Sequence, residues 1–313
     1  MTPPPPALLI ASSHVARGTV GLRAAVHAAE ALGHPTWSVP TVHLPWHPGR
    51  GPGTRAVWSP ETFAAYVGDL ARSPRLGEVS GMLTGYLGHP AQAEALAGLV
   101  AALRRANAPA IVVCDPVIGG ERGLYVPVEV AEAIRDRLVP PADIVTPNRH
   151  ELAWLVGADA VPPDNAGLID LALGLAGRSH APDPRILVTS AHAGSGRTGN
   201  LLVARDGATL AAHAVSDAPN SGTGDLTAAL LLARLLGGDG HGAGPGGDGS
   251  GGDGPDRDGS ARDGDDALAL ATASVSAVMA LADRTGADEL PLERARDALV
   301  SPDAATVELI RLA

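Results

Sequence analysis

Short apolar runs that are typical of buried strands alternate with amphipathic helical segments along most of this chain. This alternation limits the fold more than any other feature, because strands joined by helices form a mainly parallel sheet that the helices cover on both faces. No break in composition marks a second domain, so we predict a single α/β domain over residues 1–313. Ligands of such sheets bind beyond the carboxyl ends of the strands, and we expect the functional residues at this edge.

The expected elements follow from apolar periodicity and from the turn residues between the runs. We predict a hairpin around Asp206-Gly207, because such a dipeptide between two apolar runs favours a tight turn. The predicted strands are Ala7–Ala11, Thr36–Leu44, Val79–Thr84, Ala110–Cys114, Asp143–Val145, Arg185–Thr189, Asn200–Ala204 and Thr209–Ala214. The predicted helices are Val20–Leu32, Glu61–Arg72, Pro90–Asn107, Val128–Arg137, Glu151–Val156, Gly167–Gly177, Thr223–Leu236 and Ala267–Asp283. Two shorter helices are predicted after these, near the end of the chain.

Residues 237–266 interrupt this pattern with 13 glycines and 8 aspartates among 30 residues. Such a composition cannot bury enough apolar surface to offset the conformational entropy that is lost on ordering, so we predict a disordered insertion within the domain. The recurring Gly-Gly-Asp-Gly also suggests calcium-binding repeats, but the apolar position that such repeats need is missing.

The basic residues narrow the function, because all 23 of them are Arg. Without Lys the chain has neither a Walker A phosphate loop nor a residue that could hold pyridoxal phosphate as a Schiff base. A formal net charge of −11 argues against nucleic acid or an anionic membrane as a partner.

The location of the protein in the cell is predicted from three features of the sequence. The single Cys, Cys114, excludes an intramolecular disulfide and suits a reducing cytoplasm. Met1–Ala11 lacks the positive start of a signal peptide. The longest apolar run, Leu226–Leu236, is shorter than the roughly 20 residues that span a bilayer. We therefore expect a cytoplasmic protein.

The strongest local signal is Gly222-Thr223-Gly224-Asp225, which leads directly into an apolar helix. The free N–H groups and the positive end of the helix dipole favour a phosphate group at this point, and the two glycines let the backbone approach it closely. Asp225 in the first turn is placed to accept a proton from a substrate hydroxyl during phosphoryl transfer. The alternative is that Asp225 only stabilises the start of the helix.

Two further polar clusters follow predicted strands. Asp115 comes directly after one strand, and Thr146, Asn148 and Glu151 follow the next. Asp115 and Glu151 could hold Mg²⁺, directly or through water, because this ion uses few carboxylates and keeps much of its hydration shell. The alternatives are a turn at Asp115-Pro116 and a plain helix start at Thr146.

These motifs together resemble the ribokinase-like superfamily and, within it, the pyridoxal kinases, over nearly the whole chain outside the Gly/Asp-rich segment. The Gly-Thr-Gly-Asp motif is common to the superfamily, whereas Ser-His-Val, Thr-Gly-Tyr and Tyr-Val-Pro are closer to the vitamin B6 kinases. The matching segments are Ser13–Val15, Gly18–Gly21, Leu83–Tyr86, Cys114–Gly119, Leu124–Pro127, Ala142–Asn148, Val188–Ser190 and Gly222–Asp225.

The resemblance implies a three-layer α/β/α fold and ATP-dependent phosphorylation of the 5′-hydroxymethyl group of pyridoxal, pyridoxine or pyridoxamine. It also implies Mg²⁺, room for a monovalent cation, and a homodimer. Two alternatives stay open. One is a hydroxymethylpyrimidine kinase, which uses the same fold and a similar small ring. The other is a protein that holds pyridoxal phosphate noncovalently without turnover.

Individual roles are carried over from the family residue by residue. Asp225 is then the catalytic base, with Gly222, Thr223 and Gly224 around the anion. Ser13, His47 and Tyr86 would bind the substrate ring. The nucleotide and metal region would consist of Asp115, Tyr125, Thr146, Asn148, Glu151, Thr189 and Ser190, with Asp115 and Glu151 near the metal. The alternatives are a capping role for Ser13 and ordinary packing for Tyr86 and Tyr125.

The sequence departs from the family pattern in three places. Gly119-Gly120 stands where the eukaryotic-type kinases have an Asp near the nucleotide, Leu22 stands where Asn is usual, and the third departure is at residues 45–48. Pro48 stands where these kinases have a Thr that reaches the substrate, and it offers neither a hydroxyl nor an N–H group. Trp46 either stacks on a flat ring or covers the mouth of the pocket. We interpret Trp46–Ser59 as a candidate lid, because several glycines give it freedom to move. Substrate preference is therefore less certain than the reaction type.

Overall fold

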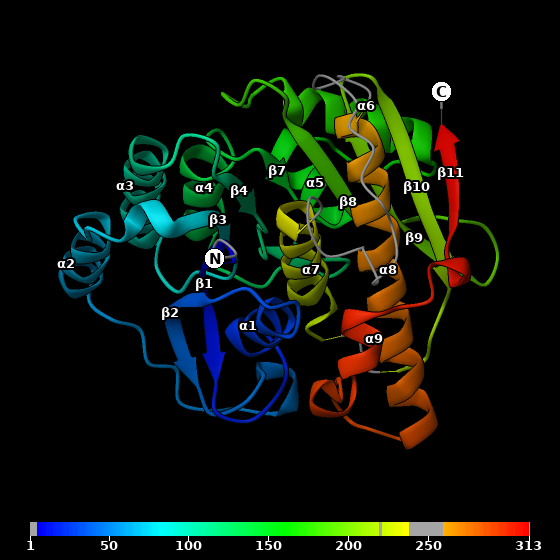
Figure 1. Ribbon diagram of the computed structural model, residues 1–313, viewed down its shortest axis with the longest axis horizontal. Helices are drawn as coiled ribbons and strands as arrows, with labels where there is room; N and C mark the ends of the chain where they lie inside the picture. The colour runs from blue at the N-terminus through cyan, green and yellow to red at the C-terminus, as the bar shows by residue number, and fades with distance from the viewer. Residues whose placement is uncertain (1–4, 219–220, 238–258, 313) are drawn as a thin grey trace, which may run out of the picture.

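The computed structural model describes residues 5–218, 221–237 and 259–312. Its centre is a nine-stranded sheet with the order β11-β10-β9-β8-β7-β4-β3-β1-β2 (Figure 1). Strands β2, β1, β3, β4, β7 and β8 pair in parallel. Strands β9, β10 and β11 continue the sheet from β8 by antiparallel pairing at one edge. The parallel strands are β2 (Thr36–Leu44), β1 (Ala7–Val15), β3 (Val79–Thr84), β4 (Ile111–Cys114), β7 (Ile144–Val145) and β8 (Arg185–His192). The antiparallel edge consists of β9 (Arg197–Ala204), β10 (Gly207–Ala214) and β11 (Glu308–Leu312).

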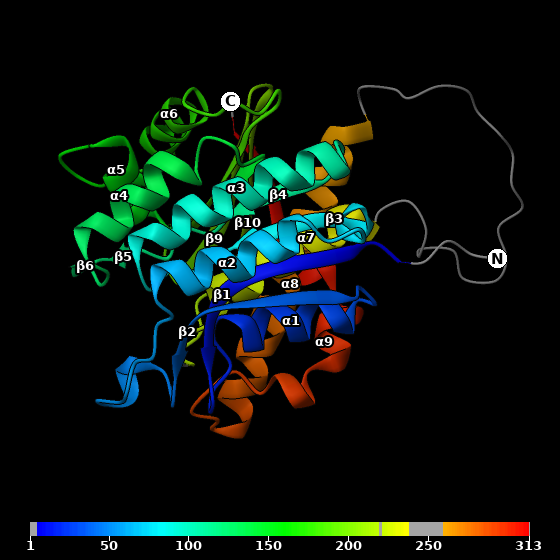
Figure 2. The ribbon, with the colours of Figure 1, turned by 90° about the vertical axis from the view of Figure 1, so that its left-hand side faces the viewer.

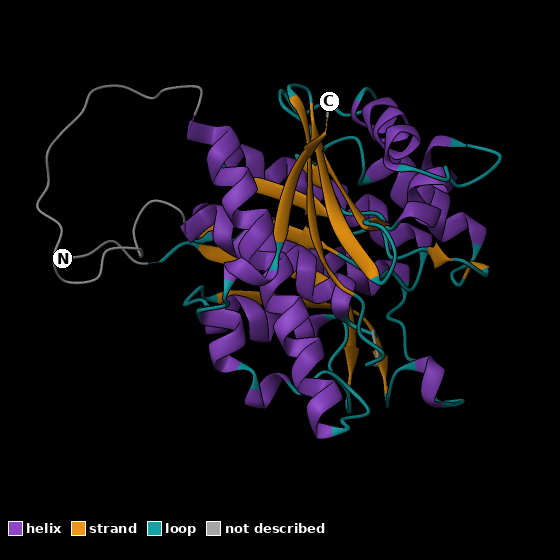
Figure 3. Cartoon of the chain, turned by 90° about the vertical axis from the view of Figure 1, so that its right-hand side faces the viewer, coloured by secondary structure: helices purple, strands orange, loops and turns teal. Residues whose placement is uncertain are grey.

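Helices cover both faces of this sheet, and each face has its own buried apolar cluster. Figure 2 shows α2, α3 and α4 on one side of β1 and β2, with α1 and α9 on the other. The first layer is α2 (Pro60–Ala71), α3 (Pro90–Ala106), α4 (Val128–Arg137), α5 (Arg149–Val156) and α6 (Asn165–Ala176). The second layer is α1 (Leu22–Ala31), α7 (Thr223–Gly237), α8 (Gly259–Thr285) and α9 (Arg296–Val300). Figure 3 shows the strands between these helices. The predicted three-layer α/β/α fold is confirmed.

Strand β1 shows why the sheet must lie between two layers. Leu9 packs into the cluster under the first layer, whereas Leu8 and Ile10 pack into the cluster under the second, and all three are fully buried. Because successive side chains of a strand point to opposite faces, a continuous apolar run satisfies both clusters at once. With aromatic residues at only 3% of the chain, aliphatic side chains fill most of this interior.

Local capping signals begin several helices where the sequence places them. The hydroxyl of Ser59 accepts a hydrogen bond from the N–H of Thr62 at the start of α2, with Pro60 at the first helical position. Asp164 caps α6 in the same way. Such caps satisfy N–H groups that a helix cannot pair internally, so short sequence patterns determine where these helices begin.

Most predicted elements are confirmed, and the last part of the chain shows the main differences. Helix α8 begins at Gly259, so residues 259–266 are helical, not part of a disordered insertion; residues 238–258 lie outside the described residues. The composition of residues 237–266 taken as a whole did not indicate this helix start, because most of the glycines lie before Gly259. Strand β11 was not predicted, and the short hairpin of β5 (Gly119–Gly120) and β6 (Gly123–Leu124) was also missed.

One helix in the described part of the chain, Gly264–Thr285, has the length and hydropathy of a membrane span. More than half of that window is buried inside the protein. Residues along α8, among them Leu268, Val275 and Val278, belong to the apolar cluster beneath the second helix layer. Packing against the rest of the domain therefore accounts for the apolar character of this helix.

Candidate active site

A cavity of about 640 Å³ opens beyond the carboxyl ends of the parallel strands. Every residue predicted from the sequence for the site lines this one cavity, although the residues come from segments across most of the chain. They are Ser13, His47, Tyr86, Asp115, Tyr125, Thr146, Asn148, Glu151, Thr189, Ser190, Gly222, Thr223, Gly224 and Asp225.

Glycines allow the end of β1 and the start of α7 to meet at the floor of the cavity. Gly222 has a φ of +92°, and a Cβ atom there would lie 2.2 Å from the carbonyl oxygen of Thr19. Gly21 has a φ of +57°, and a Cβ atom there would lie 2.2 Å from the carbonyl oxygen of Ser13. No other residue fits these two contacts. Gly222 is required where α7 approaches the loop after β1, and Gly21 is required where that loop passes close to Ser13.

Asp225 stands in the first turn of α7 and lines the cavity. Burial raises the pKa of its carboxyl group from 3.8 to about 6, although hydrogen bonds from the N–H of Gly21 and from its own N–H act in the opposite direction. A pKa near 6 leaves the group ionised at neutral pH and makes it a stronger base than an ordinary Asp.

Asp115, at the end of β4, is a second buried carboxylate on the cavity wall. Burial raises its pKa well above the ordinary value, and the charges of Asp225 and Glu151 raise it further. None of these three carboxylates forms an ion pair with an Arg in the described part of the chain. No cation of the described residues therefore balances these groups, and a bound cation would favour their ionised forms.

Glu151 is held by backbone donors. Its Oε1 accepts hydrogen bonds from the N–H groups of Ile118 at 2.8 Å and Gly119 at 3.1 Å. Its Oε2 accepts one from the N–H of Asn148 at 2.9 Å, and the side chain of Asn148 accepts from the N–H of Glu151 in return. Asn148 and Glu151 thus form a capping box at the start of α5, which begins at Arg149 and not at Thr146 as the helix-start alternative had it. It also ties the β5–β6 hairpin to α5.

The residues present fit a magnesium ion that is held mainly by phosphates and water. The described residues contain no group of three His, Cys, Asp or Glu side chains arranged to hold a metal. However, the buried hydroxyl of Thr146 lines the cavity together with Asp115, and its hydrogen bonding partly counters the rise that burial causes in the pKa of that carboxyl group. A hydroxyl oxygen beside a carboxyl group suits a hydrated divalent cation or a phosphate group.

The other end of the cavity is shaped for a ring. Tyr86 lines it and is held by its backbone, because its N–H donates to Ser12 Oγ at 3.2 Å and its carbonyl accepts from Thr41 Oγ1 at 2.6 Å. The apolar side chains of Val20 and Leu44 face the same space. The ring of Tyr86, the hydroxyl of Ser13 and the side chains of Val20 and Leu44 form a slot that suits a small flat ligand.

His47 adds a hydrogen-bond donor at this end. Its Nδ1 accepts a hydrogen bond from the N–H of Gly49 at 3.2 Å. Burial, together with the charge of Arg50, lowers the pKa of His47, which favours the neutral ring. With Nδ1 accepting, a neutral imidazole carries its proton on Nε2, so His47 offers one N–H donor.

The β5–β6 hairpin forms one wall of the cavity. The side-chain amide of Asn148 donates to the carbonyl of Gly119 at 2.9 Å, and the hydroxyl of Tyr125 lies 3.5 Å from Glu151 Oε1. A Cβ atom on Gly119 would lie 2.9 Å from the carbonyl oxygen of Gly123, so the hairpin needs glycine there. Tyr125 is still 56% exposed, which leaves the hairpin able to cover a ligand from outside.

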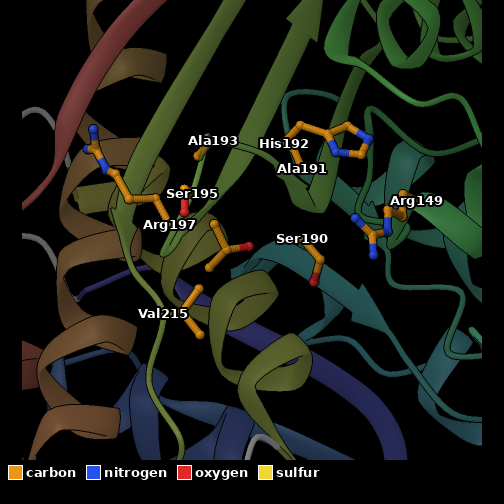
Figure 4. A pocket seen from close by; sticks show the side chains of 10 residues that line it. Arg149, Ser190, Ala191, His192, Ala193, Ser195, Arg197 and Val215 are labelled. Carbon is orange, nitrogen blue, oxygen red and sulfur yellow. The ribbon is translucent and has the colours of Figure 1, made fainter.

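A second cavity of about 490 Å³ lies beside the first, and Ser190 lines both of them (Figure 4). Ser190, with a φ of 57°, and Val117, with a φ of 44°, are the described non-glycine residues in the left-handed region. Val117 follows the end of β4, whereas Ser190 lies within β8 where its pairing with β9 is irregular, and both line the first cavity, so backbone strain is concentrated where a ligand would bind. Sequence analysis did not identify Val117 or Leu44 as site residues, since neither carries a polar or charged signal.

Comparisons with known proteins give two kinase descriptions, phosphomethylpyrimidine kinase for the family model and pyridoxal kinase for the relatives. A family model described as phosphomethylpyrimidine kinase matches residues 77–241. A pyridoxal kinase of Rubrobacter xylanophilus is 34% identical over 94% of each chain. A pyridoxal kinase of Granulibacter bethesdensis is 37% identical over 73% of this chain and 81% of its own.

A solved structure has the same architecture. A pyridoxal kinase from Leishmania donovani, in complex with ADP and pyridoxamine, matches 98% of this chain and 99% of its own, with a TM-score of 0.80 and 25% identity. The sequence relatives, the fold and the gathering of the predicted residues in one cavity lead to one conclusion. The chain belongs to the pyridoxal kinase family of ribokinase-like proteins.

Proposed function

We propose that this protein transfers the terminal phosphoryl group of ATP to the 5′-hydroxymethyl group of pyridoxal, and also of pyridoxine and pyridoxamine, giving the 5′-phosphate. The observation that carries the proposal is the single cavity that joins a ring-shaped slot to a glycine-lined helix start with Asp225 between them. The relatives named pyridoxal kinases support the substrate class.

The vitamer would lie in the slot formed by Ser13, Tyr86 and Leu44, with its hydroxymethyl group toward Asp225. His47 donates a hydrogen bond to an acceptor on the ring through Nε2. The apolar walls and the fixed backbone of Tyr86 orient the ring, so that one hydroxyl meets the incoming phosphoryl group. Orientation of this kind supplies a large part of the rate enhancement in phosphoryl transfer.

ATP would lie across the strand ends, from the start of α7 to the second cavity. The N–H groups at Gly222–Gly224 and the positive end of the α7 dipole stabilise charge on the transferring group. Asp225 accepts the proton of the hydroxymethyl group as the new P–O bond forms, and the bond from the transferred phosphorus to ADP breaks. The Tyr125 hairpin and the loop at His47 exclude water, which would otherwise hydrolyse ATP.

Mg²⁺ is part of the proposal. Asp115 and Thr146 would hold the hydrated ion against the phosphates, and Glu151 would orient this region through its backbone hydrogen bonds. When bound, the ion neutralises phosphate charge and polarises the transferring group. A monovalent cation in the same negative region is proposed on the same charge argument.

A panel of acceptors tests the proposal directly. Purified protein is incubated with ATP and Mg²⁺ and with pyridoxal, pyridoxine, pyridoxamine or hydroxymethylpyrimidine, and phosphorylated products are separated by chromatography. We expect phosphate on the B6 vitamers. Phosphate only on the pyrimidine would overturn the proposal in favour of the hydroxymethylpyrimidine kinase alternative, which the description of the matching family model favours.

A binding measurement distinguishes the proposed kinase from the remaining alternative, a protein that holds pyridoxal phosphate without turnover. Tight binding of pyridoxal phosphate without turnover of any acceptor would identify a noncatalytic binding protein, as the Pro48 departure suggests.

A homodimer and a cytoplasmic location are also proposed, from the resemblance and from the single buried thiol of Cys114, whose pKa burial raises to about 12. Light scattering on the purified protein tests the dimer.

A further inference from the structure

We infer that Arg149 binds the phosphate groups of the nucleotide that are not transferred, on the side of Ser190 away from Asp225. This inference rests on the proposed function. Arg149 is the first residue of α5 and lines the second cavity, whereas Ser190 lines both cavities. A nucleotide that extends from the start of α7 past Ser190 therefore passes Arg149.

The charge of the site requires such a cation. Asp115, Glu151 and Asp225 place three carboxylates around the first cavity, and no Arg of the described ranges lines that cavity. The chain has no Lys, so Arg side chains are its only permanently charged cations. An ATP molecule would add about four negative charges to this region, and a bound Mg²⁺ offsets only part of them.

Among the residues that the structure describes, two Arg side chains line either cavity, and one of them is already engaged. Arg197 donates to Glu308 Oε2 at 2.5 Å and to the carbonyl of Ala212 at 3.2 Å. Figure 4 shows its side chain pointing away from Ser190. Arg197 therefore supports the β9–β10–β11 edge of the sheet, and its guanidinium group is not available to a ligand.

Arg149 is in the opposite situation. Its guanidinium group forms no ion pair with a carboxylate in the described residues, and its hydrogen bond goes to the ring of His150, with 3.4 Å between Arg149 Nε and His150 Nε2. In Figure 4 the side chain extends from α5 toward the side of the cavity where Ser190 lies. A positive charge at the start of a helix is unfavourable for the helix itself. Local structure therefore gives no reason for an Arg at this position, whereas a phosphate ligand does.

The test uses Arg149→Gln, which removes the charge and keeps a shorter, uncharged polar side chain. We expect the KM for ATP to rise about ten- to hundredfold, because a hydrogen bond to a charged group contributes that much to binding. The KM for pyridoxal should stay unchanged. Arg149→Lys should recover part of the loss, since it restores the charge but not the paired donors.

Direct binding separates a phosphate contact from a structural role. Calorimetric titration should show that Arg149→Gln weakens ADP binding about tenfold or more, while adenosine binds as to the wild type. Arg205→Gln is the matched control, because Arg205 is exposed in the turn between β9 and β10 and its loss changes the net charge equally.

The possible outcomes distinguish the inference from the proposed function. Equal ADP affinity in the wild type and Arg149→Gln would overturn the inference and leave the kinase proposal standing. An equal loss of ADP and adenosine binding would also overturn it, since it would show a distorted cavity. Absence of ADP binding by the wild-type protein would overturn both.

Discussion

The two ends of the active-site cavity are built in different ways. At the phosphate end, Asp115 and Glu151 are buried, and backbone N–H groups of two segments hold the Glu151 carboxylate. At the ring end, the loop of residues 45–51, here called the ring-end loop, closes the cavity with His47, Pro48 and Gly49. The phosphate end belongs to the rigid core of the sheet, whereas the ring end depends on a surface segment.

Exposed ion pairs hold the ring-end loop. Arg50 of this loop lies 3.0 Å from a carboxylate oxygen of Asp288, which also lies 3.2 Å from Arg17. Arg17 reaches Glu289 as well, at 3.4 Å. The side chains of Arg17 and Asp288 are about 60% exposed, and solvent screens such pairs so that they stabilise the loop only weakly.

This difference has a consequence for function. The chemistry of phosphoryl transfer needs fixed positions, so its residues lie on buried strand ends and helix starts. Recognition of the ring tolerates variation, and two departures from the family pattern, at Trp46 and Pro48, fall on the ring-end loop, although another, at Gly119-Gly120, lies near the nucleotide. We expect substitutions at the phosphate end to have large effects and those at the ring end to have small ones.

The largest effect is expected at Asp225. Asp225→Asn keeps the size of the side chain and removes the base, so turnover should fall by about 10²- to 10⁴-fold, equivalent to roughly 3–5 kcal/mol of barrier. Steady-state rates with saturating ATP and pyridoxal measure this. Asp206→Asn, in the exposed turn between β9 and β10, is the control. Turnover of Asp225→Asn near that of the control would remove Asp225 from the chemistry.

The raised pKa of Asp225 predicts opposite effects of pH on stability and on activity. The folded protein binds the proton more tightly than the unfolded chain, so the free energy of unfolding should fall as pH rises from about 4 to about 6, by up to about 3 kcal/mol for this group. Over the same range activity should rise as the base ionises. Urea unfolding of wild type and Asp225→Asn at several pH values measures the difference. Parallel curves for the two proteins would contradict the prediction.

Glu151→Gln tests whether the capping box holds the phosphate end together. The amide would place an N–H group against backbone N–H donors of Asn148 or of Ile118 and Gly119, so the protein should lose about 1–3 kcal/mol of unfolding free energy. Urea unfolding measures the loss, with Glu129→Gln, an exposed residue in the first turn of α4, as the control. A loss no larger than in the control would show that these hydrogen bonds contribute little.

A smaller effect is expected at the ring end for Pro48→Thr. The substitution returns the hydroxyl that the family pattern has at this position, and one neutral hydrogen bond lowers the KM for pyridoxal about two- to tenfold. The KM for ATP should not change. Comparing the KM values of the three vitamers shows for which of them the substitution lowers the KM. An unchanged KM for all of them would mean that position 48 does not face the substrate.

The smallest effect is expected for Asp288→Asn, which weakens the exposed ion pairs of the ring-end loop. The KM for pyridoxal should rise no more than about fivefold at low salt, and the difference should shrink at high salt because exposed charges are screened. Kinetics at two ionic strengths measure this. A loss of turnover comparable to that of Asp225→Asn would mean that the two ends of the cavity are not built differently after all.

Elements with strong local patterns could be predicted from the sequence. The bounds of β2, β3 and α4 agree with the apolar periodicity, and the spacing of Asn148 and Glu151 already indicated a helix start. The edge strand β11 could not be predicted in this way. It is short, and its partner β10 lies about a hundred residues earlier in the chain, so only the folded sheet gives it a place.

The sequence by itself determined the order of strands and helices, the glycine-lined start of α7 and the polar residues after each strand. These depend on side-chain periodicity and on hydrogen bonds between near neighbours, which a short segment specifies alone. Only the tertiary structure decided which charges meet: that Arg50 pairs with Asp288, 238 residues away, that Arg197 is engaged, and that Arg149 faces a cavity. Charged side chains far apart in the chain interact only where packing brings them within a few ångströms, and no local pattern records that distance.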